Sequence, residues 1–506
     1  MVIFSEKSRI FVVMKKIVSI IAVLAVILPS LPAIGQERLG LTLDEAIRLA
    51  GIYSLDAQVA KLRFVGRHWA YRSYKAELLP AINLGGNLAQ FNRSMVETRN
   101  YETGEINYVR NNTLQNSLTL SIDQNIPVLG GTVSVQSYLY RLDQFDYKST
   151  QWNTNPLIIS YTQPLRTYNE LKWRKKTEPK EYERAKRQYL ESLQDVAIQT
   201  TRRFFAALKA QSDYEQSLVT LSDRQALYER AQKRFELTTI NKSDLLQLEL
   251  SLLNARVAVK ENAIALSDKR FSLFSYLGAL EYERVTLVQP NNITDLKLMI
   301  DDVESRAFTN STHSLTQELT LLQSEQELAY AKSKKGLQMT LNSRLGLTKS
   351  SDTFRGAYTN LNDNEVIGIT LTLPIFDWGV SKGKVKVAEA NLSVAKTEIE
   401  LANLEYRQTI DMLVKTFNNK SEQFSDASRA LAIARERYDI SMNRYEAGAI
   451  TVTELNTAQQ ELEQAKAQYI VQLEAYWSNY YEIQKTTLYD YMHRCDLTAD
   501  FDALVK

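Results

Sequence analysis

The chain has 506 residues with 61 basic and 59 acidic side chains, which leaves a formal net charge of +2. A charge so close to zero gives no bulk attraction to nucleic acid, so we expect no nucleic-acid partner. Cys495 is the single cysteine, which excludes an intrachain disulfide, and the three histidines lie too far apart in sequence for metal-ligand spacing. Dispersed surface or helix histidines are the simpler interpretation, and we predict no metal site.

The N-terminal residues 1–35 have the pattern of a secretory signal peptide. Two lysines precede the apolar run 17–28, and the small residues Ala33 and Gly35 follow it, which predicts cleavage before Gln36. The alternative is a transmembrane anchor, but the apolar run is shorter than the roughly 20 residues that a spanning helix needs. No later stretch is apolar enough for such a helix, so the exported chain is expected to be soluble or to cross a membrane as a β-barrel.

The first half of the exported chain, residues 36–279, is predicted to begin with a helix. Thr42 and Glu45 have the spacing of a capping box, in which two side chains satisfy backbone N–H groups at a helix N-terminus. The helical pattern continues to about Leu79, where Pro80 ends it. A helix of that length with few glycines or prolines favours a helical bundle or tube.

Residues 80–165 change from a helical period to a period of two. In the segment 117–126 apolar and polar residues alternate, as in strands with one apolar and one polar face. The Gly-Gly pair at 130–131 suits a hairpin turn, and long polar loops are expected at 92–113 and 143–156. Strands of this kind are typical of outer-membrane barrels, with a soluble β-sandwich as the alternative.

Residues 166–279 are predicted to form a long helical hairpin. Its first arm runs to about Glu236, and a short turn follows. Ser243 is expected to cap the return helix, with Asp244 in the first turn, where a carboxylate is favourable to the helix dipole. Gly278 is expected to end the return helix as a C-cap. No ordinary globular domain needs a helical hairpin so long.

The second half of the chain repeats the order of the first at a constant offset. Pro164 maps onto Pro374 and Ile240 onto Ile450, in each case 210 positions later. A repeat of this length indicates a duplicated half-protein rather than a solenoid unit. The segments predicted after residue 279 are a linker at 280–300, a second repeat at 301–490 with a helix, strands at 340–376 and a hairpin at 377–489, and a polar C-terminal tail at 491–506 without a clear fold signal.

The turn of the second hairpin carries a family resemblance. The segment 444–459 has a tyrosine, a small residue, a glycine, a β-branched run and an acidic residue before a leucine, and it resembles the TolC family of outer-membrane efflux proteins. The strand-to-helix junctions at 163–165 and 373–379 also resemble that family, and the likeness covers about residues 41–490. The resemblance implies a mainly α homotrimer of the cell outer membrane, in which one shared β-barrel, in contact with lipid, continues as a long periplasmic α-helical barrel.

The number of strands departs from the family pattern. The family usually has two strands in each half, whereas residues 80–165 offer four candidates. The extra pair is either a longer hairpin within the barrel or an addition beside it. A single chain with a handful of strands would leave open edges, which lipid does not tolerate, so closure by three chains agrees with the physics.

The function implied by the resemblance is a passive exit duct. It would serve a tripartite efflux or type I secretion system and would join a periplasmic adaptor and an inner-membrane transporter to the outside. The alternative is a periplasmic coiled-coil adaptor or interaction protein, although adaptors typically have one hairpin flanked by lipoyl-like β-domains. The sequence shows no glycine-rich phosphate loop, nucleophile elbow or metal-spaced His/Cys set, so we expect no enzyme, no catalytic residue and no cofactor.

The resemblance places a periplasmic gate just past the second hairpin turn. Glu454 falls on the first acidic position of the family, and the second position is Thr457, which is neutral. Asp244 is the first-half equivalent, expected on the outer helix pair. Threefold symmetry would bring three Glu454 carboxylates around one axis, where they would attract cations. The alternative is that Glu454 only complements the helix N-terminus, a role worth about 0.3–1 kcal/mol.

The two hairpin turns are also predicted to dock the adaptor. Exposed apolar residues are unusual in a free turn and suit a partner surface. The alternative is packing between neighbouring turns in the closed trimer. The predicted docking residues are Thr239, Ile240, Gly448, Ala449, Ile450 and Val452.

Overall fold

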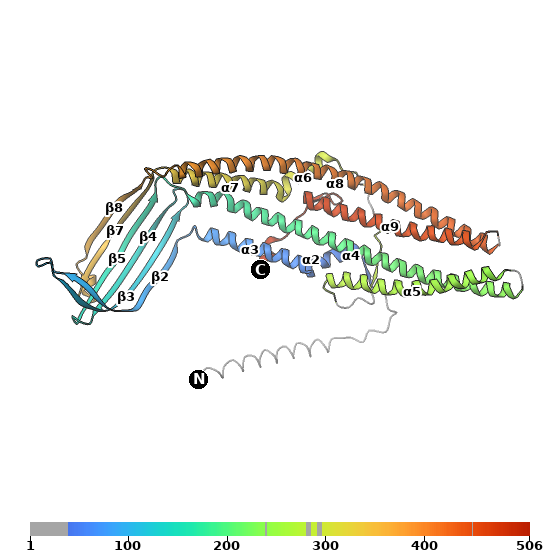
Figure 1. The fold of residues 1–506 in the computed structure, drawn as a ribbon, viewed down its shortest axis with the longest axis horizontal. Helices are drawn as coiled ribbons and strands as arrows, with labels where there is room; N and C mark the ends of the chain where they lie inside the picture. Colours follow the sequence, from blue (N-terminus) through green and yellow to red (C-terminus); the bar gives the residue numbers. More distant parts are fainter. Residues whose placement is uncertain (1–38, 238–239, 280–284, 291–295, 448) are drawn as a thin grey trace, which may run out of the picture.

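The computed structural model describes residues 39–237, 240–279, 285–290, 296–447 and 449–506. Over these residues the chain is elongated, with an antiparallel sheet at one end and paired helices that run away from it (Figure 1). The predicted mainly α chain with a β section is confirmed. The predicted signal peptide at 1–35 lies outside the described residues.

The elements of the described residues follow one another as two strand regions, each preceded by short helices and followed by a long hairpin. The helices are α2 (Leu43–Tyr53), α3 (Leu55–Ala76), α4 (Glu170–Glu236), α5 (Lys242–Tyr276), α6 (Ile300–Asn310), α7 (Thr312–Lys335), α8 (Val380–Glu446), α9 (Val452–Thr487) and α10 (Phe501–Val505), with a short 3-10 turn η1 (Gly356–Tyr358). The strands are β1 (Leu39–Leu41), β2 (Ala81–Arg99), β3 (Ile106–Ile126), β4 (Gly131–Gln144), β5 (Ser149–Pro164), β6 (Val285–Leu287), β7 (Gln338–Ser351), β8 (Asn362–Thr372), β9 (Tyr489–Asp490) and β10 (Cys495–Asp496).

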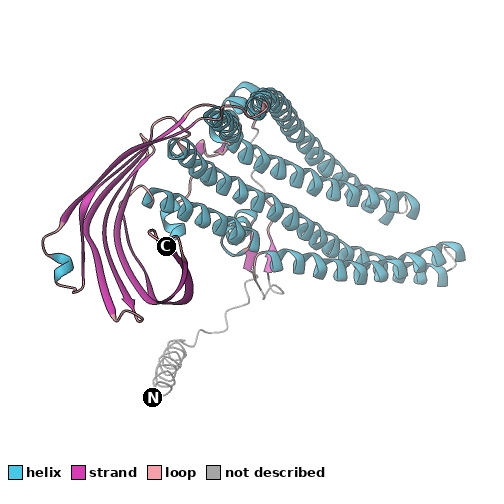
Figure 2. Cartoon of the chain, turned by 60° about the vertical axis from the view of Figure 1, so that its left-hand side comes forward, coloured by secondary structure: helices cyan, strands magenta, loops and turns pink. Residues whose placement is uncertain are grey.

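The large sheet of the described chain has six strands in the order β2-β3-β4-β5-β7-β8, and each neighbouring pair is antiparallel. Figure 2 shows these strands as one curved layer. The extra strand pair of the first half therefore lies within the same sheet as the other strands. Within the described residues, β2 and β8 are the edges of the sheet.

The register gives the sheet one apolar and one polar face. Residues that pair directly across strands share a face, because side chains alternate along each strand. One row that crosses five strands is entirely apolar, and the next row is mostly polar. The apolar row is Ile82, Ile122, Val135, Ile159 and Leu345, and the polar row is Ala81, Asp123, Ser134, Ser160 and Arg344.

The long polar loops predicted at 92–113 and 143–156 are wrong. Most of these residues belong to strands, and the connections are only residues 100–105 and 145–148. The ladder between β2 and β3 continues to the pair Arg99 and Ile106, so backbone hydrogen bonds are satisfied within the hairpin. Polar side chains are compatible with such a two-stranded ribbon because it buries neither face.

The first predicted helix is broken in two. Ser54 has an extended backbone, and its hydroxyl accepts a hydrogen bond from the N–H of Ala57 at 3.2 Å, which starts α3. Ser311 separates α6 from α7 in the same way. The capping box of Thr42 and Glu45 at the start of α2 is confirmed.

The two long helices span most of the helical section. α4 and α8 each have 67 residues, which corresponds to about 100 Å. α8 and α9 begin 210 residues after α4 and α5, the same offset as in the sequence. Near the sheet the helices contact one another in the order α3-α4-α7-α8, and farther away in the order α5-α4-α9-α8. The protein thus has a wall of helices in two consecutive rows, with α8 at one end of both.

The largest core lies at the middle of the helical section. There the parallel pair β1 and β6 joins the two halves of the chain. Phe204, Phe417 and Tyr476 are fully buried in this core. Gly278 ends α5 with a φ of +72°, as predicted for a C-cap, and a side chain there would also approach Tyr53 to 3.2 Å.

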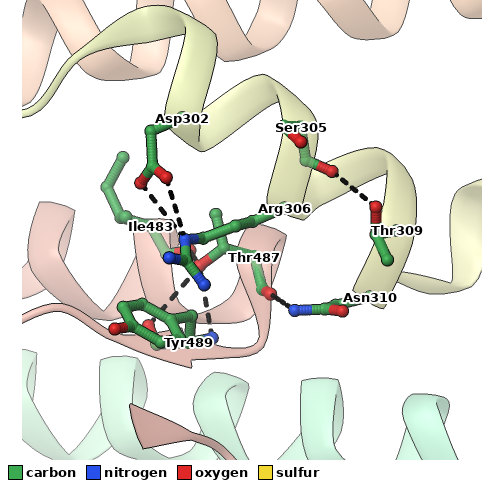
Figure 3. A network of polar contacts seen from close by, with 8 residues as sticks. All are labelled: Asp302, Ser305, Arg306, Thr309, Asn310, Ile483, Thr487 and Tyr489. Atoms are coloured by element: carbon green, nitrogen blue, oxygen red, sulfur yellow. Dashed lines mark hydrogen bonds and ion pairs between the residues drawn. The ribbon is translucent and has the colours of Figure 1, made fainter. Parts of the chain in front are cut away.

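The C-terminal tail is folded against the helices, although its sequence gave no clear signal. β9 and β10 form a short antiparallel pair, and α10 places the ring of Phe501 5.2 Å from that of Phe64. Figure 3 shows the polar contacts where the tail begins. Arg306 on α6 binds Asp302 at 3.2 Å and lies 3.7 Å from the ring centre of Tyr489. These contacts hold the end of α9 and the tail against α6.

Candidate functional site

The turns of the two helical hairpins pack against each other within one chain. Leu248 and Leu455 are buried in a small apolar cluster, and Ile240, Ile450 and Val452 pack against it. These three residues are half-buried rather than exposed as expected. The apolar side chains of each turn have found a partner in the other turn, which removes them from water.

Of the remaining predicted docking residues, the structure describes only Ala449. Ala449 is exposed, and its N–H donates to the carbonyl oxygen of Arg444 at 2.9 Å. Thr239 and Gly448 lie outside the described residues. The structure thus defines the packing of the two turns, and adaptor docking stays a prediction.

The predicted gate residues lie at the first turns of the return helices. Glu454 is exposed and forms a capping box with Thr451: its carboxylate accepts from the Thr451 N–H at 2.9 Å, and its own N–H donates to the Thr451 hydroxyl at 3.3 Å. Thr457 is exposed and donates to the Thr453 carbonyl oxygen at 3.0 Å. The capping role of Glu454 is present, and a role in a gate stays a prediction.

Asp244 lies in the first turn of α5 and is exposed. Its N–H donates to the side chain of Asn241 at 2.9 Å, so Asn241 caps this helix. The prediction that Ser243 is the cap is therefore wrong. Asn and Ser serve equally well at this position, and the helix begins two residues earlier than the sequence pattern indicated.

A layer of polar contacts joins the two hairpins beyond the apolar cluster. The hydroxyl of Tyr438 on α8 donates to a carboxylate oxygen of Asp223 on α4 at 3.2 Å. Burial and the nearby Asp223 carboxylate raise the pKa of Tyr438 to about 12, so the tyrosine is a protonated donor at physiological pH. The contact links the first hairpin to the second through a charged acceptor.

Arg224 forms the second link of this layer. Its side chain is only 7% exposed, and it donates to the side-chain oxygen of Gln459 on α9 at 2.5 Å. The amide nitrogen of Gln459 donates to the Thr220 hydroxyl at 2.8 Å and to Glu463 at 3.1 Å. Burial lowers the pKa of Arg224, but an arginine stays charged at physiological pH. A buried charge of this kind is costly unless it keeps its partners.

We use the term inter-hairpin polar layer for Asp223, Arg224, Tyr438 and Gln459. It borders a polar cavity of about 420 Å³ between α4, α5 and α9. The sequence did not single out these residues, because polar side chains at helical spacing look the same whether they face water or a neighbouring helix. Only the packing of α4 against α8 and α9 distinguishes them.

The ends of the helical wall carry exposed apolar residues at a regular spacing. On α5, Leu250, Val257, Ile264 and Phe271 recur every seven residues, and each is at least half exposed. A spacing of seven is the pattern of a helix seam that packs on another helix. The same spacing occurs in exposed residues at the other ends of the rows. These residues are Leu55, Leu62 and Trp69 on α3, and Val380, Val387, Val394, Leu401, Ile433 and Ile440 on α8.

Two other kinds of site are absent from the described part of the chain. No group of three or more His, Cys, Asp or Glu side chains there lies close enough to hold a metal ion. No helix in the same part is long and apolar enough to cross a membrane.

Comparisons with known proteins agree with the resemblance found in the sequence. Residues 313–483 match the family model described as outer membrane efflux protein. No curated protein matches the sequence. Among solved structures, the fold is similar to the CmeC outer membrane channel of Campylobacter jejuni, with a TM-score of 0.62 and 14% identity over 91% of this chain and 88% of that one.

Two further channels show the same fold. The outer membrane protein VceC of Vibrio cholerae has a TM-score of 0.58 and 15% identity, over 88% of this chain and 95% of that chain. The MtrE outer membrane channel of Neisseria gonorrhoeae, in its open state, has a TM-score of 0.58 and 13% identity, over 90% of this chain and 91% of that one. At such low identity these likenesses establish the fold.

Proposed function

We propose that this chain, a TolC-type outer membrane efflux protein by its fold and by the match of residues 313–483, forms the passive exit duct of an efflux or secretion system. The duct would be a homotrimer with its sheet in the outer membrane and its helices in the periplasm. The observation that carries this proposal is that sheet and helical wall both end in surfaces suited to a second copy of the chain.

The edges of the sheet support closure by copies of the same chain. β2 runs away from the helices and β8 runs back towards them. Because the sheet has an even number of strands, β8 of one copy can pair with β2 of the next in the antiparallel sense. Such pairing removes the open edges, which is required of a sheet within lipid. The apolar face then meets the acyl chains and the polar face lines the lumen.

The helical wall supports the same arrangement. One row ends at α3 and α8 and the other at α5 and α8, and each end carries the exposed apolar spacing described above. Rotation about a common axis would bring α8 of one copy against α3 and α5 of the next. Packing of these seams would bury apolar side chains that are otherwise in contact with water.

Exposed aromatic residues at the foot of β8 suit the membrane boundary. Phe376 is 72% and Trp378 88% exposed, and both lie between the sheet and α8. Tryptophan rings, which are amphipathic, are enriched where the hydrocarbon of a membrane meets water, and the apolar ring of Phe376 lies beside that of Trp378. These residues support a sheet end in the outer membrane, with the hairpin turns about 100 Å away in the periplasm.

The partners follow from this placement. The hairpin turns would meet a periplasmic adaptor, and an inner-membrane transporter would supply the energy for transport. The inter-hairpin polar layer would hold the turns together in the closed state of the duct. A periplasmic coiled-coil adaptor is the weaker alternative, because one large amphipathic sheet and two long hairpins exceed what a single-hairpin adaptor contains.

The test is the oligomeric state of the purified full chain. We expect extraction from outer membranes only with detergent, and a trimer by light scattering. Ile264→Asp, on the exposed seam of α5, should shift the trimer towards monomer, whereas Ala265→Asp, on the adjacent exposed position, should not. A monomer that is soluble without detergent would refute the proposed duct.

A further inference from the structure

The width of the six-stranded sheet matches the width of the helical wall. At a strand spacing of about 4.8 Å and a tilt of about 40°, six strands cover roughly 38 Å of a barrel circumference. Four neighbouring helices at 8–10 Å between axes cover about 32–40 Å. Each chain contributes six strands and, in either row, four helices. At the same tilt, a sheet of four strands would cover only about 25 Å.

From this match, and resting on the proposed trimeric duct, we infer that the membrane section is an 18-stranded barrel as wide as the helical tube, which passes bulky water-soluble cargo. Three copies give a backbone diameter of about 36 Å, against about 24 Å for twelve strands at the same tilt. With about 5 Å of side chain on each side, the free bore is about 26 Å instead of about 14 Å.

The lining of the bore suits a water-filled passage. The polar face presents hydroxyl, amide and a few charged groups, among them Thr119, Asp123, Ser134 and Arg344. Asp123 accepts hydrogen bonds from Ser121 at 2.8 Å and from Ser134 at 2.5 Å, so the lining side chains are fixed to the wall. A bore of this composition transmits hydrated solutes without selecting strongly for one charge.

The loop between β7 and β8 leaves the polar face uncovered. The hydroxyl of Thr154 donates to the carbonyl oxygen of Ala357 in this loop at 2.5 Å. Thr154 pairs with Leu139, which pairs with Leu118 on the apolar face. Phe354 of the same loop packs against Trp152, with ring centres 5.2 Å apart. The loop is therefore fastened to the apolar side, where it does not narrow the bore.

The hairpin of β2 and β3 is the segment that extends beyond the rest of the sheet. β4 pairs with β3 only up to Thr113, so residues 93–112 form a two-stranded ribbon. Before the ribbon begins, the pairing of β2 with β3 is irregular between Asn87 and Gln90, where Ala89 has a φ of +56°. The ribbon stands outside the closed wall, so the test of the bore includes a variant in which it is shortened.

The experiment measures the size of reagent that reaches the polar face from outside intact cells. In a Cys495→Ser background, Thr370→Cys places a thiol on the polar face near the foot of β8, and Ile369→Cys places one on the apolar face of the same strand. A maleimide on a rigid carrier about 20 Å wide fits a bore of about 26 Å but not one of about 14 Å. We expect this carrier to label Thr370→Cys as completely as a small maleimide does, and not to label Ile369→Cys.

A second variant and a direct measurement complete the test. Replacement of residues 95–110 by an Asn-Gly turn shortens the β2–β3 ribbon at the paired positions Ser94 and Asn111. Exclusion of the carrier from both the full-length and shortened variants, while the small maleimide still labels, would overturn the wide bore but leave the duct. Failure of the small maleimide to label Thr370→Cys in the assembled protein would instead refute the proposed duct. An electron cryomicroscopy map of the trimer should show eighteen strands, and twelve strands would overturn the inference.

Discussion

Removal of one hydroxyl from the inter-hairpin polar layer should release the closed state of the duct. Tyr438→Phe deletes the donor to Asp223 and changes nothing else in the shape of the side chain. A hydrogen bond to a charged group contributes about 1.5–3 kcal/mol when it is shielded from water. Both residues are only half-buried. We therefore expect the hydrogen bond between them to stabilise the closed state by about 1 kcal/mol per chain.

Threefold symmetry multiplies this contribution. Three lost bonds amount to about 3 kcal/mol, which raises the ratio of open to closed ducts by about 150-fold. The measurement is the open probability of single channels in a planar lipid bilayer. Asp223→Ala, which removes the acceptor, should have a similar effect, and the double variant should add little, because both changes remove the same contact.

The matched control is Tyr228→Phe. The hydroxyl of Tyr228 accepts a hydrogen bond from Gln232 within α4, so its loss does not affect the contact between hairpins. The control should leave the open probability unchanged. If Tyr438→Phe behaves like Tyr228→Phe, the polar layer does not hold the hairpins together, and the assignment of a closing role to it is incorrect.

Three further predictions concern the turns and the tail. Glu454→Gln should change cation selectivity or block by divalent ions if three carboxylates form a ring, whereas an unchanged current in a bilayer would leave only the capping role of Glu454 seen here. Ile450→Asp should reduce cross-linking to the adaptor and keep the trimer, and loss of both together would favour a purely structural role in the apolar cluster. The hydrogen bond to Asp490 raises the pKa of His493 above its usual value, so this contact should stabilise the tail fully below about pH 6.5 and lose its effect as the pH rises through the raised pKa. The amide protection factors of residues 489–496, which correct the exchange rates for base catalysis, should therefore be higher at acidic than at alkaline pH, and a His493→Gln variant should lack this dependence.

Local signals in the sequence predicted the long elements well. The capping box at Thr42 and the C-cap at Gly278 depend on contacts within a few residues, and both are present in the structure. The hairpin turns and the 210-residue offset were also readable, because they follow from residue order alone. Ser54 gives no clear sequence signal for a break, since a serine is tolerated both inside a helix and as its cap. Its burial, which decides between the two, depends on distant elements.

The sequence does not predict the features that depend on tertiary contacts. The polar segment at 92–113 reads as a loop by composition, but pairing with the opposite strand makes it part of β2 and β3. Phe501 of the tail has no helical or strand period around it, and its place is set by the rings of Phe64 and Tyr189. Prediction of the inter-hairpin polar layer likewise depends on which helix faces contact each other, and the sequence alone does not show this.

The unpaired edges of the sheet and the exposed seams of the helical wall make the single chain a vulnerable intermediate. Before three copies meet, β2 and β8 offer free backbone groups to any other extended chain, which is a route to aggregation. In the proposed assembly, trimer formation therefore competes with aggregation, and the concentration of protomers affects which of the two prevails. The apparent melting temperature of the assembly should rise with protein concentration, because the folded form of each chain is completed by its neighbours. Slow synthesis, or loss of a periplasmic chaperone, would thus reduce the yield of ducts without any change in the sequence.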